Sequence, residues 1–310
     1  MYKTNDKCPY AVVVGAVNID IGGRSFKPLI AKDSNPGTVS ISPGGVGRNI
    51  AHNIRLLGAD VKFMTAMGDD LYAKQIAEHC KQIGIDLSCS VNIKGGSTST
   101  YLFIAGPDGD MALAISDTDI AKYITPDFIS ERLDILNNAS AVVFDTNLTE
   151  ETIRFIAENC TAPLFTDPVS VSKAYKLKPV LKYLHTIKPN VIEAELLSGV
   201  KITDETSLKA AAKALTDTGV KNVFITLGDK GVLFKSTAEE LFVPAPSAKV
   251  INTTGAGDAF CAALVWAFIN GIKPAEAALY GSAASALAIE TEETINERLN
   301  LNEIKARLGR

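Results

Sequence analysis

Two glycine-rich segments contain the residues of this chain that are best suited to carry chemistry. Residues 43–49 read Pro-Gly-Gly-Val-Gly-Arg-Asn, and residues 252–258 read Asn-Thr-Thr-Gly-Ala-Gly-Asp. Each precedes a stretch of helical character, where glycines let backbone amides approach and stabilise a bound anion. Neither has the third glycine of a dinucleotide-binding fingerprint, and the chain lacks the Gly-Lys pair of a Walker A loop. Either segment alone is equally well explained as an ordinary turn before a helix.

Further polar side chains stand where buried strands are expected to end. Asp258 taken alone is explained as an acid that complements the dipole of its helix. However, Asn18 and Asp20 follow the first apolar strand, and segments 190–193 and 226–228 follow later strands. Ligands of parallel α/β sheets gather beyond the carboxyl ends of the strands. The combination therefore predicts one ligand site at that edge of a sheet.

Apolar periodicity predicts the alternating strands and helices that must bring these segments together. The valine-rich run at residues 11–14 is typical of a strand buried on both faces, and Ile50, Ile54 and Leu57 predict a helix from about Gly47. Further strands are expected at 61–67, 141–147, 163–169, 185–190 and 222–228, and helices at 71–83, 151–159, 208–217 and from about residues 258 and 274. Such alternation implies right-handed crossovers and a mostly parallel sheet with helices on both faces.

One part of the sequence departs from this alternation. Two β-like segments at residues 98–105 and 110–116 are joined by Pro-Asp-Gly, which is typical of a hairpin turn. A second irregular stretch covers about residues 22–42. We expect the two to form a small sheet hinged on the α/β body, with lid segments at about 20–43 and 95–117 of a single domain spanning 1–310.

Composition limits the class of protein and its partners. The 310 residues are 46% apolar and 21% charged, which is typical of a globular chain. The net charge of −4 and the absence of long runs of like charge argue against nucleic acid as a partner. The five cysteines form no CxxC or Cys/His cluster, which favours free thiols in a reducing compartment. With a polar amino terminus and no apolar run of about 20 residues, we expect a cytoplasmic protein without a membrane partner.

In their order along the chain, these motifs resemble the signatures of the ribokinase-like carbohydrate kinases, the PfkB family. The resemblance covers nearly the whole chain. Residues 44–49 resemble the first family signature, and the segment 252–260, which ends in Asp-Ala-Phe, resembles the second. The Asn-x-x-Glu pattern at 190–193 resembles the family motif that organises magnesium and phosphate.

Within the family, the chain most resembles the pseudouridine kinases. The residues that carry this finer resemblance are Val-Asn-Ile-Asp at 17–20, Asp-Ser-Asn-Pro-Gly at 33–37, Arg48, and Lys-Pro-Asn at 188–190. The resemblance implies a three-layer α/β/α ribokinase-like fold with a mostly parallel central sheet and a small β-sheet lid. It also implies transfer of a phosphoryl group from ATP to the 5′-hydroxyl of pseudouridine.

The resemblance assigns roles to individual residues. Asp258 would be the general base, with a contribution of about 10²–10⁴-fold to the rate, and the amides of Gly255, Ala256 and Gly257 would stabilise the transferred phosphate. The substrate would be held by Asn18, Asp20, Gly44, Gly45, Arg48, Asn49 and Asn147. ATP would lie against Asn190, Thr226, Gly228 and Gly231, and Glu193 would hold Mg²⁺ through water.

Two positions depart from the family pattern. Asn147 replaces a sugar-binding glutamate of ribokinases, which indicates a ligand other than free ribose, although Asn147 could also simply begin the next helix. Family members activated by a monovalent cation carry aspartate where this chain has Asn252. Dependence on K⁺ therefore stays open, and a turn role for Asn252 is at least equally favoured.

The resemblance also implies how the lid works and which alternatives remain. The hairpin would close over the sugar and exclude water, and two lids would pair in a homodimer. One alternative is a kinase for another nucleoside or for a free sugar such as ribose or fructose. Another is a catalytically dead relative that only binds such a ligand, which the intact Gly-Ala-Gly-Asp motif at 255–258 disfavours.

Overall fold

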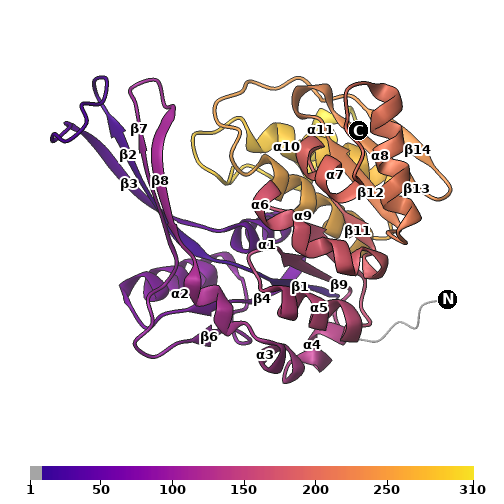
Figure 1. The fold of residues 1–310 in the computed structure, drawn as a ribbon, viewed down its shortest axis with the longest axis horizontal. Coiled ribbons are helices and arrows are strands. Elements are labelled where there is room, and N and C mark those ends of the chain that lie inside the picture. The colour runs from indigo at the N-terminus through magenta and orange to yellow at the C-terminus, as the bar shows by residue number, and fades with distance from the viewer. Residues whose placement is uncertain (1–8) are drawn as a thin grey trace.

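An eight-stranded sheet forms the centre of the computed structural model, which describes residues 9–310 (Figure 1). Its strands, in spatial order, are β14 (Glu240–Val243), β13 (Val232–Ser236), β12 (Asn222–Thr226), β11 (Thr186–Ile187), β10 (Leu164–Asp167), β9 (Ala141–Asp145), β1 (Tyr10–Val14) and β4 (Asp60–Met64). The strands from β12 to β4 pair in parallel, whereas β13 and β14 add an antiparallel edge. The expected mostly parallel sheet is confirmed.

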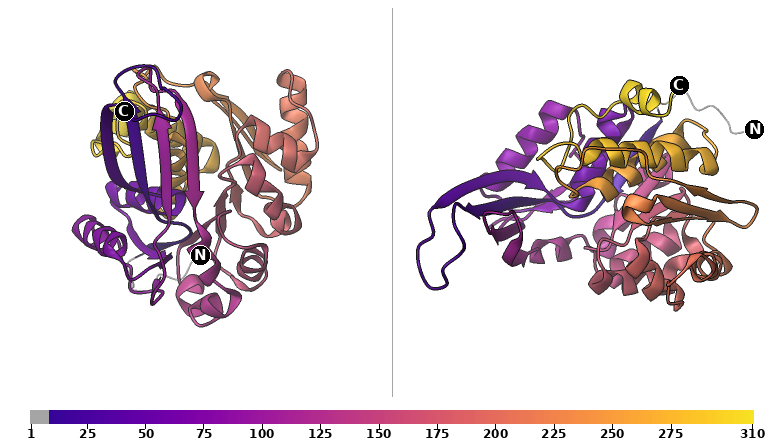
Figure 2. Two further views of the ribbon diagram at one scale, coloured as in Figure 1. Left: turned by 60° about the vertical axis from the view of Figure 1, so that its left-hand side comes forward. Right: turned by 90° about the horizontal axis from the view of Figure 1, so that it is seen from above.

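Helices cover both faces of this sheet and complete three layers (Figures 1 and 2). One face carries α1 (Val46–Leu56), α2 (Leu71–Ile83), α9 (Ala256–Ile269), α10 (Pro274–Ala288) and α11 (Leu301–Arg307). The other carries α3 (Pro126–Ser130), α4 (Leu133–Asn137), α5 (Glu150–Asn159), α6 (Val171–Ala174), α7 (Val191–Ser198) and α8 (Glu205–Asp217). Three 3₁₀ segments connect elements along the chain: η1 (Asp119–Tyr123), η2 (Tyr175–Tyr183) and η3 (Gly228–Lys230).

The central strand β1 explains why the sheet needs both helical layers. Ala11 and Val13 belong to the core under α1 and α9, whereas Val12 and Val14 belong to the core on the opposite face. All four side chains are fully buried. Successive residues of a strand point to opposite faces, so a continuous apolar run requires a cover on each.

A second sheet projects from one end of the body (Figure 2). Its four strands lie in the order β3 (Gly37–Gly44), β2 (Asn18–Ser25), β7 (Thr100–Ala105) and β8 (Met111–Asp117). A short pair, β5 (Ala66–Met67) and β6 (Val91–Asn92), lies elsewhere. We call the four-stranded unit the lid sheet.

The two faces of the lid sheet differ in chemistry. The register places Ile41, Ile21, Leu102 and Ile115 in one row across the strands, with Val39, Ile104 and Leu113 beside them. Of these, Val39 is 72% exposed and Leu113 is 61% exposed. The opposite face carries Asp20, Tyr101 and Phe103. One face is thus apolar and uncovered, and the other carries the polar side chain of Asp20.

The structure corrects some details expected from the sequence. Asn18 and Asp20 do not end the first strand, because β1 stops at Val14 and a short crossing leads into β2. The strands β13 and β14 and the helices α3, α4, α6, α7 and α11 were not foreseen. Within residues 9–310, no helix combines the length and apolar character needed to cross a membrane.

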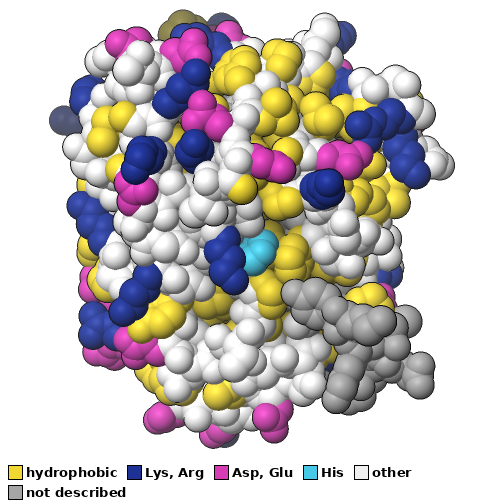
Figure 3. Space-filling view, turned by 90° about the vertical axis from the view of Figure 1, so that its right-hand side faces the viewer, with side chains coloured by type: hydrophobic (Ala, Val, Ile, Leu, Met, Phe, Trp, Pro, Cys, Tyr) yellow, Lys and Arg dark blue, Asp and Glu magenta, His cyan; other side chains and the backbone are white. Residues whose placement is uncertain are grey.

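The face turned away from the lid sheet carries mixed charges. Figure 3 shows lysine and arginine side chains interspersed with acidic ones, and apolar groups between them. No extended field of one sign forms on this face. A polyanion would need such a field, because its phosphates are neutralised by clustered lysine and arginine.

Candidate active site

The two glycine-rich segments meet at the amino ends of α1 and α9. Gly45 caps α1 with φ of 97°, and Gly255 caps α9 with φ of 84°, a left-handed conformation that favours glycine. At this junction the Asn49 side-chain amide donates to Asp258 Oδ2 over 2.9 Å. The contact joins two residues that are 209 positions apart in the sequence. The first and second motifs therefore form one site.

The carboxyl group of Asp258 is not used to cap its helix. It lies in the first turn of α9, yet α9 has no side-chain hydrogen bond at its amino end. Burial raises its pKa to about 7, assisted by the nearby charge of Asp167, although the Asn49 hydrogen bond and Lys188 act in the opposite direction. A carboxyl group with such a pKa can accept and release a proton near neutral pH.

A buried ion pair supports the first turn of α9. Lys188 Nζ lies 2.9 Å from Asp167 Oδ2, and both side chains are over nine-tenths buried. A Cβ on Gly257 would lie 3.1 Å from the same Nζ, which places the ammonium beside the start of the helix. Burial lowers the pKa of Lys188, but Asp167 outweighs this, so the pKa is raised and the side chain stays charged. The start of α9 thus lies beside a buried ion pair whose ammonium is the member closer to Gly257.

Asp145 holds the loop that runs from β1 toward the lid sheet. Its Oδ2 accepts from the Ala16 amide over 2.9 Å, and its Oδ1 accepts from the Asn147 amide over 2.8 Å. A Cβ on Gly15 would collide with this carboxylate, so only glycine lets the loop pass so closely. Burial raises the pKa of Asp145 despite these hydrogen bonds.

Asn18, Asp20 and Gly44 form the polar wall of the lid sheet beside the site. Asn18 donates to Asp20 Oδ1 over 2.5 Å, and a side chain at Gly44 would collide with the Asp20 carboxylate. Burial raises the pKa of Asp20, and its hydrogen bond with Asn18 and the charge of Arg48 oppose this. The Asp20 side is the face of the lid sheet opposite to its uncovered apolar rows.

Asn190 and Glu193 are joined in a capping box at the start of α7. The Asn190 side-chain oxygen accepts from the Glu193 amide over 3.0 Å, and Glu193 Oε2 accepts from the Asn190 amide over 2.9 Å. This use of its oxygen leaves the Asn190 NH₂ group for a ligand. Burial and the charge of Asp167 raise the pKa of Glu193, which the nearby Lys188 opposes.

The residues present suit Mg²⁺ bound mainly by phosphates. Within residues 9–310, no cluster of three or more metal-binding side chains occurs. Mg²⁺ commonly keeps several waters and takes only one or two carboxylates when it accompanies nucleotide phosphates. Glu193 Oε1 accepts no hydrogen bond from the described part of the chain, so that oxygen is open to a metal-bound water. The donor set therefore fits a water-mediated ion.

Thr226, Gly228 and Gly231 form the neighbouring turn at the carboxyl end of β12. Thr226 and Asn190 form an isolated parallel β-bridge, in which the Thr226 backbone amide donates to the Pro189 carbonyl over 3.0 Å. The Gly231 amide donates to Gly228 over 3.2 Å and closes a tight turn. These residues line the same sheet edge as Asn190, as expected from the strand ends.

The sequence left the roles of Asn147 and Asn252 undecided, and the structure shows the contacts of both. Asn147 follows β9, its side-chain oxygen accepts from Lys173 over 2.5 Å, and its side chain also hydrogen-bonds to the Asp145 carboxylate. Asn252 accepts from the Thr254 amide over 2.9 Å and donates to the Glu292 carbonyl over 2.9 Å. Asn252 therefore has the turn role that the sequence favours at least as much as a role in cation binding.

The sequence assigned no role in the site to four charged residues of this region, although Lys188 is part of the Lys-Pro-Asn motif: Asp145, Asp167, Lys173 and Lys188. Asp145 and Asp167 are the last residues of β9 and β10, and Lys188 directly follows β11. Polar residues that end buried parallel strands meet at the ligand edge, and this signal was available. The pairing of Asp167 with Lys188 could not be predicted, because no spacing rule links residues on separate strands.

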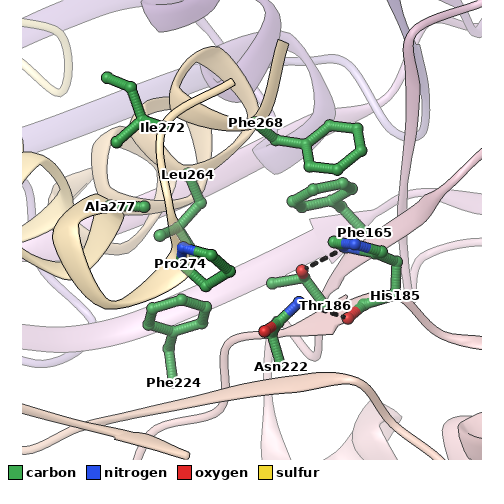
Figure 4. A pocket seen from close by; sticks show the side chains of 10 residues that line it. All are labelled: Phe165, His185, Thr186, Asn222, Phe224, Leu264, Phe268, Ile272, Pro274 and Ala277. Carbon is green, nitrogen blue, oxygen red and sulfur yellow. Dashed lines mark hydrogen bonds between the residues drawn. The ribbon is translucent and has the colours of Figure 1, made fainter. Parts of the chain in front are cut away.

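A small cavity of about 20 Å³ lies away from this site (Figure 4). It is lined by aromatic and apolar side chains around His185 and Asn222, which stand at the amino ends of β11 and β12. His185 stacks on Phe165 at 5.2 Å between ring centroids, and burial lowers the pKa of His185 to about 4. The cavity is at the sheet edge opposite to Asp258 and holds little more than a water molecule.

Comparison with known proteins gives a consistent family. Residues 9–300 match the pfkB family carbohydrate kinase domain. A pseudouridine kinase of Escherichia coli K12 is 35% identical, with 94% of each chain covered. An uncharacterized sugar kinase of the same strain is 38% identical over 90% of this chain and 78% of that one.

A solved structure extends this likeness to the fold. The crystal structure of a putative sugar kinase from Clostridium perfringens superposes with a TM-score of 0.88 and 37% identity. The superposition covers 98% of this chain and 96% of the other. The shared fold confirms the expected ribokinase-like architecture. The chain therefore belongs to the pfkB family of carbohydrate kinases and is a phosphotransferase that uses an alcohol group as acceptor.

Proposed function

We propose that this chain is a pseudouridine kinase, which transfers the γ-phosphoryl group of ATP to the 5′-hydroxyl of pseudouridine. The observation that carries the catalytic part is the buried Asn49 to Asp258 contact of 2.9 Å between the two motif loops. The similarity to a pseudouridine kinase over 94% of both chains supports the choice of substrate. The alternatives are other nucleosides and free sugars.

Asp258 is the proposed general base. Its Oδ2 accepts from Asn49, and Oδ1 accepts no hydrogen bond from the described residues, so Oδ1 is free for the substrate hydroxyl. As the 5′-oxygen forms its bond to the γ-phosphorus, its proton passes to Asp258. The bond from phosphorus to the bridging oxygen breaks, and ADP leaves with that electron pair.

The amino end of α9 stabilises the charge on the transferred group. The amides of Gly255, Ala256 and Gly257 stand at the positive end of the helix dipole, where fixed donors lower the barrier most effectively. The buried Lys188 ammonium lies beside Gly257 as well, as the positive member of its ion pair with Asp167. A chain of net charge −4 thereby handles phosphates locally, without a basic surface.

ATP is proposed to lie along the carboxyl ends of β11 and β12. The free NH₂ group of Asn190 suits phosphate oxygens, and Thr226, Gly228 and Gly231 border the nucleotide. Glu193 would hold Mg²⁺ through water at the oxygen not used in the capping box. When bound, Mg²⁺ neutralises phosphate charge and orients the phosphates.

The nucleoside is proposed to bind between the lid sheet and α1. Asn18 and Asp20 offer oxygens to the vicinal hydroxyls of ribose, and Gly44, Gly45 and Asn49 complete the wall. Asn147, whose side chain contacts Lys173 and Asp145, would present a neutral amide at the position where a glutamate provides a carboxylate.

A substrate panel tests this proposal. ADP release is measured with Mg²⁺-ATP and matched concentrations of pseudouridine, uridine, adenosine, ribose or fructose. We expect the highest kcat/KM for pseudouridine, with ribose and fructose at least about 100-fold lower, because they leave base-binding groups unpaired. The same protein with Asp258→Asn controls for contaminating kinases. Preference for any other compound would reject pseudouridine as the substrate but would keep the phosphotransferase activity.

We also propose that the lid sheet closes over the substrate and pairs with the lid of a second copy. The uncovered rows of Ile41, Leu102 and Ile115 and of Val39 and Leu113 form a contiguous exposed apolar face, and such faces mark interaction surfaces. A second copy related by a twofold axis offers the same flat apolar face in return, so the contact is self-complementary. Two such sheets can pack about 10 Å apart as a sandwich.

Replacement of Leu113 by lysine tests the lid contact. Two desolvated ammonium groups would enter the contact, so we expect the dimer to dissociate at least about 100-fold more readily. Light scattering with size-exclusion chromatography measures the mass over a range of concentrations. The control is Leu241→Lys, because Leu241 is a partly exposed leucine on the distant strand β14. A monomeric wild type, or a Leu113→Lys variant that stays dimeric, would contradict the proposal.

The location proposed for the reaction is the cytoplasm. The described cysteines Cys80, Cys89, Cys160 and Cys261 are free thiols, in line with expectation, and Cys8 lies outside the described residues. Free thiols are usual where glutathione and thioredoxin keep cysteines reduced. This chemistry supports a reducing compartment for the enzyme.

A further inference from the structure

Arg48 is a buried charge that no ion pair explains. It lies in the first turn of α1 and is only 4% exposed. Within residues 9–310 no carboxylate lies in ion-pair range of its guanidinium, and its Nε has no hydrogen-bond partner. The carboxylates of Glu297, Asp20 and Asp258 act on it only from beyond ion-pair distance. A buried charge without a close partner costs several kcal/mol, so its presence calls for a function.

The guanidinium has one side-chain partner, and that partner touches the proposed base. Arg48 Nη1 donates to Asn49 Oδ1 over 2.9 Å, and Asn49 Nδ2 donates to Asp258 Oδ2 over 2.9 Å. A guanidinium can only donate, so the amide must turn its oxygen toward Arg48. The amide NH₂ is then forced to face Asp258. The three side chains form a chain of hydrogen bonds with a single direction.

This direction matters because Asp258 can exist in two protonation states. A neutral carboxyl group can donate its proton to an amide oxygen, and an ionised one needs an amide NH₂ group. A free asparagine could flip and satisfy either state. Burial and Asp167 already favour the neutral acid, so a free amide would reinforce that preference.

We propose that Arg48 is a positioning residue that locks the polarity of the Asn49 amide, so that Asn49 can only donate toward Asp258 and supports its ionised, proton-accepting form. Arg48 therefore acts through Asn49 and need not touch the nucleoside. The inference rests on the proposed role of Asp258 as base. It deepens that role, because it names the group that keeps the base ionised in a dry site.

Other charged groups also face Asp258 and must stay constant in the test. They come from the ends of β9 and β10, from the turn after β11, from α1 and from the next turn of α9: Asp145, Asp167, Lys188, Arg48 and Cys261. Only Arg48 reaches Asp258 through an amide that can flip. Substitutions at Arg48 and Asn49 leave the remaining groups in place.

The pH dependence of kcat/KM measures the ionisation of Asp258 in the free enzyme. For the wild type we expect an acid limb near pH 7, because the pKa of Asp258 is about 7 and only the ionised form accepts a proton. Arg48→Met removes the donor and should move this limb upward by about one pH unit, a loss of about tenfold on its acidic side. Arg48→Lys, which can also only donate, should restore most of the wild-type profile.

A double-mutant cycle separates this role from a direct effect of charge. In an Asn49→Ala background the amide is gone, so Arg48→Met should cause no further shift of the limb. A full shift in that background would overturn the proposal, because Arg48 would then act on Asp258 through space. An unchanged limb in the single Arg48→Met variant would overturn it as well.

Further variants guard against a folding artefact. Asn49→Asp gives Arg48 a carboxylate partner but cannot donate to Asp258, so it should raise the limb even if Arg48→Met does not fold. The control is Arg55→Met, the same substitution in the last turn of α1, where the guanidinium pairs with Asp60 at 2.7 Å. The acid limb of this variant should match that of the wild type. A limb that moves with Arg55→Met as far as with Arg48→Met would assign the shift to general disturbance.

A readout without turnover keeps the two proposals apart. Carbon-13 NMR titration of the Asp258 carboxyl group in the full-length protein reports its pKa directly. An NMR shift on Arg48→Met that disappears in the Asn49→Ala background would support the polarity lock even if the wild type phosphorylates none of the panel compounds. Activity of the wild type with an unmoved NMR titration would reject the lock and leave the kinase function intact.

Discussion

Asp258→Asn should lower kcat by at least about 100-fold and leave the affinity for ATP nearly unchanged. The substitution keeps the shape of the side chain, and its oxygen can still accept from the Asn49 amide at the 2.9 Å contact. An amide cannot take up the proton of the attacking hydroxyl, however. Initial rates of ADP release give kcat, and isothermal titration with a non-hydrolysable ATP analogue gives the affinity.

A chemically equal substitution at a distant carboxyl group provides the control. Asp60 is exposed at the amino end of β4, the sheet edge opposite to the site, and Asp60→Asn should leave kcat within about twofold. The melting temperature of each variant shows whether the fold is kept. Near-normal turnover of a folded Asp258→Asn protein would remove Asp258 from the proton-accepting role.

Lys188→Met should destabilise the protein by about 3–5 kcal/mol, because it leaves Asp167 as a buried carboxylate without its partner. For a chain of this size the melting temperature should fall by about 5–8 °C. Turnover should fall too, since the ammonium beside Gly257 would be lost and the pKa of Asp258 would rise further. Thermal unfolding followed by circular dichroism measures the first effect, and ADP release measures the second.

A second substitution distinguishes loss of the pair from loss of packing. Asp167→Asn in the Lys188→Met background removes the orphaned charge and should recover much of the lost stability but little of the turnover. The matched control is Lys62→Met, which breaks the half-exposed pair with Asp86 and should cost less than about 1 kcal/mol. Equal melting temperatures for the Lys62 and Lys188 variants would show that the buried pair contributes no more to stability than the half-exposed one.

Much of the central sheet could be predicted from the sequence because its strands are apolar on both faces. The apolar runs of β1 and β9 are short and rich in valine, which favours strands of a doubly covered sheet over buried helices. The antiparallel edge was missed because β14 is short and largely exposed, so its pattern is weak. Asn18 was misplaced for a related reason, since Ala16 and Val17 stay buried while the chain crosses to the lid sheet.

The candidate site was predictable in its motifs but not in its electrostatics. The Gly-Ala-Gly-Asp loop and the Arg48 to Asn49 pair are visible in the sequence, and their order indicates a kinase. That Asp258 is buried, and that Arg48 faces an amide rather than a carboxylate, depends on packing between α1 and α9. A pKa near 7 arises from the loss of water around a side chain, which no local pattern encodes.

The 209-residue separation between Asn49 and Asp258 has a consequence for synthesis of the enzyme. Chains emerge from the ribosome amino end first, so β1, the lid sheet and α1 exist long before α9 is made. The base and the helix end beside it arrive only with the last sixth of the chain. A nascent or carboxyl-truncated chain that lacks α9 therefore has neither the proposed base nor the helix that packs against α1, and it cannot turn over ATP. The enzyme can therefore become active only after the ribosome has made the carboxyl-terminal part of the chain.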